Sequence, residues 1–121
     1  MRFLISAAGT GGHIFPALKF CTTCIHQSHQ VFWIGTKHGM ESKRVSEHNI
    51  PFLSVPMSGF RGKSLLKKIV SMFGLVISTL LSAIYILNNK INYVVCFGGY
   101  VSLPVGIAAI ICRKNLILHE Q

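Results

Sequence analysis

A glycine-rich turn near the N-terminus, Gly9-Thr10-Gly11-Gly12, constrains the fold more than any other stretch. Residues 3–8 before it are nearly all apolar, which is typical of a strand covered on both faces. Residues 14–28 after it have helical spacing, with Pro16 near the first turn. Glycines let backbone N–H groups approach a ligand closely, and a helix N-terminus offers unpaired donors with a partial positive charge. The stretch therefore predicts a loop that binds an anion or a sugar nucleotide.

The remaining chain alternates predicted strands with predicted helices. The strands are expected at residues 30–35, 51–55, 92–97 and 115–119, and the helices at residues 39–48, 64–88 and 104–112. Such alternation produces right-handed βαβ units and an open parallel sheet. The sequence therefore predicts a single α/β domain over residues 1–121, with a Rossmann-like open parallel sheet of about five strands and helices on both faces.

A second glycine loop, Gly98-Gly99-Tyr100, follows the predicted strand at 92–97. Ligands of open parallel sheets bind at the carboxyl ends of the strands, where both glycine loops and residues 119–121 are expected. This favours a shared pocket over the alternative that the first glycines only shape a tight turn. His13, at the start of a helix, is a candidate general base or hydrogen-bond partner, and a capping or packing role is the open alternative.

Several classes of site fit the sequence poorly. The acidic residues are Glu41, Glu47 and Glu120 alone, which disfavours a two-carboxylate glycosidase or an aspartate-rich metal site. The first glycine loop has Ile14 where a dinucleotide fingerprint has its third glycine, and no acidic residue follows the second predicted strand. Binding of NAD or FAD is therefore disfavoured, and the chain has no Walker-type phosphate loop.

The cysteines and histidines at 21–29 resemble a zinc motif. Cys21, Cys24, His26 and His29 have metal-like spacing, but they lie within or at the end of a predicted helix, where four side chains cannot converge on one ion. Cysteine is also a common small core residue, and the pair does not directly follow a strand as in a thioredoxin-like motif. We therefore expect no metal and no cofactor.

A 19-residue stretch without a charge, residues 69–87, lies in the longest predicted helix. Ser71, Ser78 and Ser82 fall on one side of that helix, which leaves the other side apolar. The sequence favours a crossover helix that docks on an anionic membrane surface, and a buried helix and a membrane span remain alternatives. The proposed docking residues are Arg61, Lys63, Lys67, Lys68, Ile69, Met72, Phe73 and Val76.

The positive net charge of the chain favours an anionic binding partner. Twelve Lys and Arg residues against three acidic ones give a formal net charge of +9, and the mean hydropathy is +0.52. A basic and apolar chain suits a membrane surface or a phosphate-bearing ligand, whereas no nucleic acid is expected, because the cations are not interleaved with aromatics. The N-terminus lacks a signal-peptide pattern, so we expect the chain in the cytoplasm, with its four cysteines reduced.

Three motifs resemble those of the MurG family of glycosyltransferases. They read GTGGHIFPAL at 9–18, FGGYVSLPVG at 97–106 and HEQ at 119–121, and the MSGFRG loop at 57–62 adds to the match. The resemblance implies a GT-B architecture, of which this chain is the N-terminal half, on the acceptor and membrane side, with the C-terminal donor domain absent. It also implies a peripheral location at the cytoplasmic face of the bacterial inner membrane.

The resemblance further implies a reaction. N-acetylglucosamine passes from UDP-N-acetylglucosamine to lipid I (undecaprenyl-diphospho-N-acetylmuramoyl-pentapeptide), which gives lipid II with inversion and without a metal. Positions matching the donor-facing motif are Thr10, Gly11 and Gly12. Those matching the acceptor-diphosphate motif are His13, Gly98, Gly99 and Tyr100. His13 is the candidate base, and Glu120 is a supporting polar residue.

The chain departs from the family pattern in three places. It stops at Gln121, where the family continues with an Asn, and it has Leu103 in place of a Gly and Asn92 in place of a Pro-Asp pair. The expectation is a fragment, a split-gene product or a remnant that is inactive alone and depends on a separate donor domain. The alternative is a non-catalytic membrane-tethered subunit that recruits a separate glycosyltransferase half.

Overall fold

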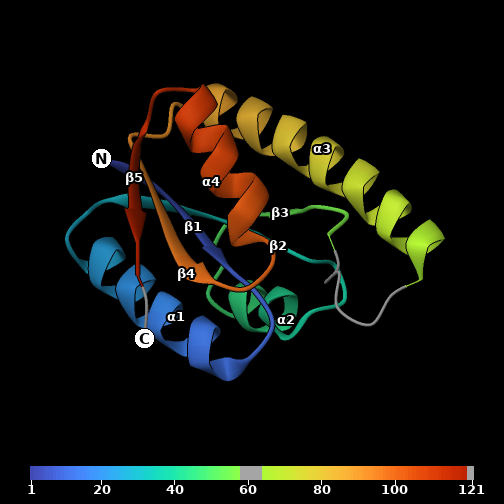
Figure 1. The fold of residues 1–121 in the computed structure, drawn as a ribbon. Helices are drawn as coiled ribbons and strands as arrows, with labels where there is room; N and C mark the ends of the chain where they lie inside the picture. The colour runs from blue at the N-terminus through green and yellow to red at the C-terminus, as the bar shows by residue number, and fades with distance from the viewer. Residues whose placement is uncertain (58–63, 120–121) are drawn as a thin grey trace.

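The computed structural model describes residues 1–57 and 64–119 and forms one parallel sheet between two layers of helices (Figure 1). Its strands occur in the spatial order β3-β2-β1-β4-β5, and every neighbouring pair is parallel. The strand bounds are β1 Arg2–Ala7, β2 Gln30–Gly35, β3 Phe52–Ser54, β4 Tyr93–Gly98 and β5 Asn115–Leu118. The predicted Rossmann-like sheet is confirmed.

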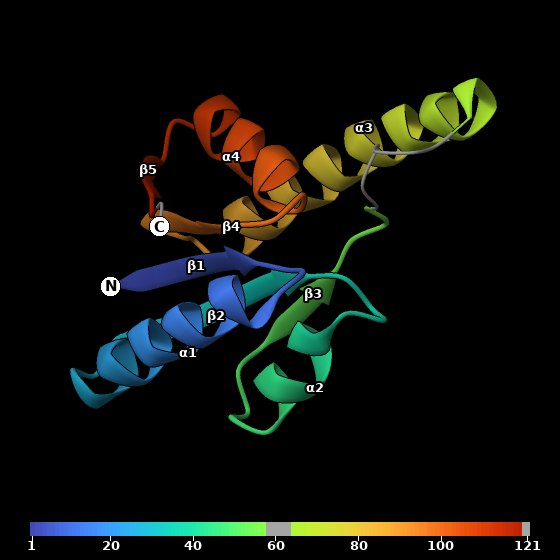
Figure 2. The ribbon, with the colours of Figure 1, turned by 60° about the horizontal axis from the view of Figure 1, so that its bottom comes forward.

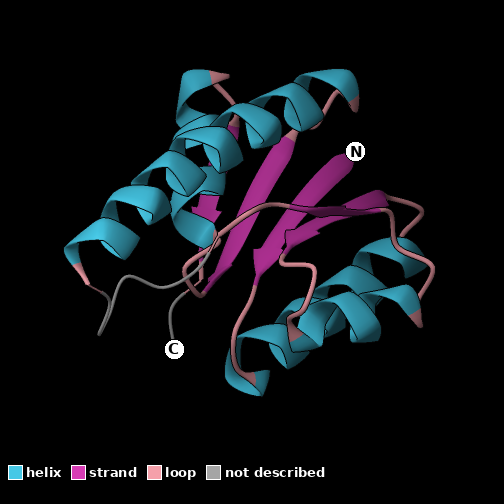
Figure 3. Ribbon diagram, turned by 90° about the vertical axis from the view of Figure 1, so that its right-hand side faces the viewer, coloured by secondary structure: helices cyan, strands magenta, loops and turns pink. Residues whose placement is uncertain are grey.

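Helices cover both faces of the sheet, as Figures 2 and 3 show. The helices α1 Gly11–His26 and α2 Met40–Ser46 pack on one face, and α3 Leu65–Asn88 and α4 Ser102–Ile111 pack on the other. Adjacent residues of β1 face opposite layers, because side chains alternate along a strand. Leu4 joins the layer under α3 and α4, whereas Ile5 joins the layer under α1 and α2.

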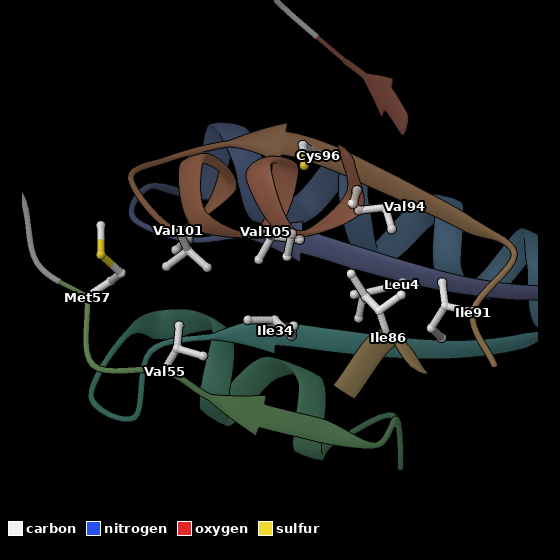
Figure 4. Packing of buried hydrophobic residues seen from close by; sticks show 13 residues of the cluster. Leu4, Ile34, Val55, Met57, Ile86, Ile91, Val94, Cys96, Val101 and Val105 are labelled. Atoms are coloured by element: carbon white, nitrogen blue, oxygen red, sulfur yellow. The ribbon is translucent and has the colours of Figure 1, made fainter. Parts of the chain in front are cut away.

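The core on the α3 and α4 side is closely packed (Figure 4). Leu4 and Val94 come from neighbouring strands, and Val101, Val105 and Ile86 reach them from the helix side with no exposed surface. Complete burial of such aliphatic side chains contributes about 1.5–3 kcal/mol each. The hydrophobic runs that predicted the strands thus also hold the helices in place.

Two helices begin earlier than the sequence suggests. Helix α1 begins at Gly11 rather than near 14, so Pro16 lies inside the helix, beyond its first turn. Helix α4 begins at Ser102 rather than at Pro104. Pro104 is tolerated there because the first N–H groups of a helix have no partner within it. The glycine turns therefore lead directly into helix.

Helix α3 presents serines to the protein and apolar side chains to the outside. Ser71, Ser78, Ser82 and Ile86 are its buried residues. Phe73 remains 67% exposed, and only 22% of the most apolar window of the helix is buried. The alternative of an ordinary buried helix is therefore wrong. By length and composition alone the helix is able to cross a membrane, so docking and spanning both remain open.

The cysteines of α1 belong to the core. Cys21 and Cys24 are buried against the sheet, and His26 lies exposed at the end of the helix. Burial, helped by the nearby Cys24 thiol, raises the pKa of Cys21 to about 12. Within residues 1–57 and 64–119, no group of three or more His, Cys, Asp or Glu side chains is placed to hold a metal ion. Cys21 and Cys24 therefore serve the packing of α1 against the sheet.

Candidate functional site

The first glycine loop connects β1 to α1 at the carboxyl edge of the sheet. Gly9 has a φ of +95°, a conformation that side chains with a Cβ rarely adopt. Thr10 is the N-cap residue, and its carbonyl oxygen accepts from the backbone N–H of His13 at 3.1 Å and of Ile14 at 3.2 Å. Its side chain makes no capping hydrogen bond. The start of α1 therefore has the geometry of an anion-binding helix N-terminus, and the binding of a ligand there stays a prediction.

The second glycine loop, between β4 and α4, packs directly against the first. Gly98 and Gly99 have φ values of +115° and +87°. A Cβ on Gly98 would collide with the imidazole of His13, and a Cβ on Gly99 would collide with the carbonyl of Ala8. The two loops approach this closely only because both residues are glycine.

Ser102 fixes the shape of the second loop. Its hydroxyl donates to the carbonyl oxygen of Gly98 at 3.0 Å and lies 3.2 Å from the Gly98 backbone nitrogen, whose N–H it accepts. A second hydroxyl, that of the buried Ser6, lies 3.5 Å from it. The loop is thus held by side chains from β1 and α4.

His13 has one ring nitrogen occupied by the protein. Its Nδ1 lies 3.0 Å from the carbonyl oxygen of Phe97. A carbonyl only accepts, so Nδ1 carries the hydrogen, and in the neutral imidazole Nε2 then has the free lone pair. The residue is half-buried in the first turn of α1. This arrangement suits a general base, because one nitrogen is fixed and the other can accept a proton.

The structure brings most of the predicted cleft residues together. Thr10, Gly11 and Gly12 form the start of α1, and His13 contacts Gly98 of the facing loop. Tyr100 continues that loop and is 37% exposed. Glu120 lies outside the described residues, so its supporting role stays a prediction.

His119, which the HEQ motif placed at this edge of the sheet without assigning it a role, lies next to the candidate site. Its ring lies against that of Phe97, with centroids 4.9 Å apart, and its backbone N–H donates to the Cys96 carbonyl at 2.9 Å. Phe97 in turn carries the carbonyl that holds His13. The position of His119 at the carboxyl end of the fifth predicted strand was the available signal.

The predicted docking residues of α3 share one outer face. Ile69, Met72, Phe73 and Val76 follow one another at helical spacing and are 45%, 60%, 67% and 57% exposed. Lys67 and Lys68 lie beside them and are also exposed. Arg61 and Lys63 lie outside the described residues. The structure thus presents an apolar surface next to cationic side chains.

Comparison with known proteins identifies the family. Residues 3–121 match the model of the glycosyltransferase family 28 N-terminal domain. The chain belongs to this family. A family 28 relative from Psychrobacter arcticus, a UDP-N-acetylglucosamine--N-acetylmuramyl-(pentapeptide) pyrophosphoryl-undecaprenol N-acetylglucosamine transferase, is 42% identical over 120 residues, which is 99% of this chain. A protein of the same name from Haemophilus ducreyi is 40% identical over 120 residues, again 99% of this chain.

Solved structures agree with this family 28 assignment. The crystal structure of Acinetobacter baumannii MurG has a TM-score of 0.86 at 35% identity and matches 98% of this chain. A Rickettsia africae glycosyltransferase, with a TM-score of 0.72 over 97% of this chain and 28% of its own, is 12% identical and so shows the fold alone. The resemblance to MurG proteins and the GT-B half-fold are therefore confirmed. The chain spans about a third of the length of these relatives, with 33% and 34% covered for the two transferases and 34% for the MurG structure.

Proposed function

We propose that this chain is the N-terminal, acceptor-binding part of a transferase that moves N-acetylglucosamine from UDP-N-acetylglucosamine to lipid I, with inversion. The observation that carries the proposal is His13, whose Nδ1 is held by Phe97 between two interlocked glycine loops. The names of the relatives supply the substrates. Because those relatives are about three times longer, we infer that residues 1–121 form one domain and that turnover needs a donor-binding part outside them.

In the proposed reaction His13 is the general base. Its Nε2 takes the proton of the acceptor's 4-hydroxyl group while that oxygen attacks the anomeric carbon of the donor sugar. The bond from the anomeric carbon to the diphosphate oxygen breaks on the opposite face, and UDP leaves with the electron pair. The N-terminus of α1, with Thr10, Gly11 and Gly12, faces the donor and favours its negative charge. Gly98, Gly99 and Tyr100 contact the acceptor diphosphate, and Glu120 supports the site.

Two substitutions of His13 separate its chemical role from its structural one. Asn in the His13→Asn variant can still donate to the Phe97 carbonyl, but it cannot act as a base, so we expect wild-type stability and a loss of about 10²–10⁴-fold in kcat. The His13→Ala variant should lose activity and also about 1 kcal/mol of stability, because the hydrogen bond is gone.

The measurement is UDP release with a lipid I analogue, using the chain together with a donor-binding half. Chemical denaturation of the same variants gives their stability. Turnover by His13→Asn at the wild-type rate would contradict the role of His13 as base. A chain that yields no turnover with any donor half would contradict the enzymatic proposal itself.

The proposal includes a peripheral position at the cytoplasmic face of the inner membrane. The exposed apolar face of α3, flanked by Lys67 and Lys68, supports docking into an anionic leaflet. The same face supports the second candidate function, a membrane-tethered non-catalytic subunit that recruits a separate transferase half. The turnover assay distinguishes the two, because only the first requires His13.

A further inference from the structure

A pocket lies at the carboxyl ends of β2 and β3 and is bordered by Tyr100 of the second glycine loop. It has a volume of about 490 Å³. Thr36, Lys37 and His38 line it from the loop after β2, Val55 and Met57 line it from the segment after β3, and Tyr100 lines it from the second glycine loop. Tyr100 therefore borders both this pocket and the proposed acceptor site.

The loop that carries Lys37 and His38 is anchored by the buried Glu41. Glu41, fully buried on α2, accepts hydrogen bonds from both the backbone N–H and the hydroxyl of Thr36, each at 2.7 Å to Oε1. A Cβ on Gly35 or Gly39 would strike the Glu41 side chain, so the loop closes over this carboxylate only with glycines at both ends. A loop held this way presents its outer side chains at little cost in conformational entropy.

The outer side chains of this loop have hydrogen-bond donors without a protein partner among the described residues. Lys37 and His38 are exposed and have no hydrogen-bond or ion-pair partner in the part of the chain that the structure describes. The ion pair present there joins Arg44 to Glu47 at 4.0 Å. Donors on a fixed loop, beside apolar groups such as Val55 and Met57, suit a ligand with both a carboxylate and apolar side chains.

The names of the relatives include such a ligand, an N-acetylmuramyl group that carries a pentapeptide. We propose that this pocket binds the peptide of the acceptor, with Lys37 and His38 receiving a peptide carboxylate and Val55 and Met57 contacting its apolar side chains. The inference rests on the proposed function. A phosphate would suit the same donors, but the proposed function already assigns the acceptor diphosphate to the glycine loops.

Soluble probes test this subsite. The first probe is a nucleoside diphosphate-linked N-acetylmuramoyl-pentapeptide, the second is the same molecule with its C-terminal carboxylate amidated, and the third lacks the peptide. Binding to the chain is measured by calorimetry. The Lys37→Ala, His38→Ala double variant is compared with a Lys43→Ala, His26→Ala control, which removes the same residue types at exposed positions away from the pocket.

We expect the chain to bind the first probe about tenfold more tightly than either of the others. The Lys37→Ala, His38→Ala variant should lose this preference, whereas the control variant should keep it. Equal binding of all three probes, unchanged in the double variant, would overturn the peptide subsite and leave the proposed function standing. Failure to bind any of the three probes would overturn both.

Discussion

Gly98 determines how close the two ligand loops come. At a φ of +115° it sits in a conformation that costs other residues of the order of 1–3 kcal/mol, and it leaves no room for a Cβ next to His13. Gly106, in the middle of α4, has neither constraint. Its backbone is helical, and a Cβ there would be in ordinary contact, 3.9 Å from Leu116. Gly106 therefore serves as the control position for an alanine substitution at Gly98.

We predict opposite effects of alanine at these two positions. Gly98→Ala should lower the free energy of unfolding by about 1–3 kcal/mol and displace His13. Gly106→Ala should raise it by about 0.5–1 kcal/mol, since alanine loses less entropy in a helix. Urea denaturation measures both. A destabilised Gly106→Ala variant together with an unaffected Gly98→Ala variant would show that the loops are not packed as described.

The free energy of unfolding should depend on pH through the Cys21 thiol. Its thiol has a pKa of about 12 in the folded chain against an ordinary value of 9.0. Below pH 9 the thiol is protonated in both states and stability does not depend on it. Between pH 9 and 12 the unfolded chain gives up this proton first, so the free energy of unfolding falls as pH rises, by up to about 4 kcal/mol.

The Cys21→Ala variant isolates that contribution. The stability difference between the parent chain and this variant should shrink or reverse between pH 8 and pH 11, measured by denaturation at each pH. Titrating groups other than the neighbouring Cys24 are common to both proteins and cancel. A difference that stays constant over this range would contradict the deep burial of the thiol.

At the scale of the element, α3 is unusual because its polar side faces the protein. Small serines allow it to lie close to its neighbours, and a Cβ on Gly74 would come within 2.7 Å of the Pro56 carbonyl. Its outward residues therefore make little contribution to folding, as the 67% exposure of Phe73 indicates. Their apolar character agrees with the proposed docking on a membrane surface.

We predict that Phe73→Glu with Val76→Glu lowers binding to vesicles of anionic lipid at least tenfold, with little change in stability, because both side chains are exposed. Vesicle sedimentation measures the binding. Ile25→Glu is the control, since Ile25 is 45% exposed on α1, which covers the other face of the sheet. If the control weakens binding as much as the double variant, α3 is not the docking surface.

At the scale of the whole molecule, the sheet topology distinguishes docking from spanning. Helix α3 leads from β3 to β4, and both of these strands belong to the same parallel sheet. A helix that crossed the bilayer would place its two ends on opposite sides, which a crossover within one sheet does not allow. Figure 2 shows the C-terminal part of α3 beside α4 and its N-terminal part projecting beyond the sheet.

The whole chain should therefore behave as a peripheral membrane protein. We predict that high salt or alkaline carbonate releases it from bacterial membranes, because lysine contacts to anionic lipid are screened or lost. Immunoblotting of the washed membranes measures the release. Extraction by detergent alone would instead indicate a spanning α3 and a sheet that differs from the one described.

The fold was largely predictable because it depends on local periodicity. Apolar runs such as 3–8 and 92–97 alternate with segments of helical spacing. The nine elements within residues 1–57 and 64–119 occur where expected, except that α1 begins three residues early and α4 begins two residues early. The outward apolar face of α3 was also visible, since the serines repeat at helical spacing. The motifs likewise pointed to His13 and both glycine loops, which the structure brings together, and their role as site residues stays a prediction.

Other features depended on contacts between distant residues. The bond from His13 to the Phe97 carbonyl joins positions 84 residues apart, and the contact of His119 with Phe97 depends on how β5 aligns with β4. The role of Glu41 beneath Thr36 depends on burial that no motif specifies. The spacing of apolar residues thus determined which helices and strands form, because it is a local property of a single helix or strand. Only the packed structure decided which side chains meet at the edge of the sheet, because register and loop geometry bring them together.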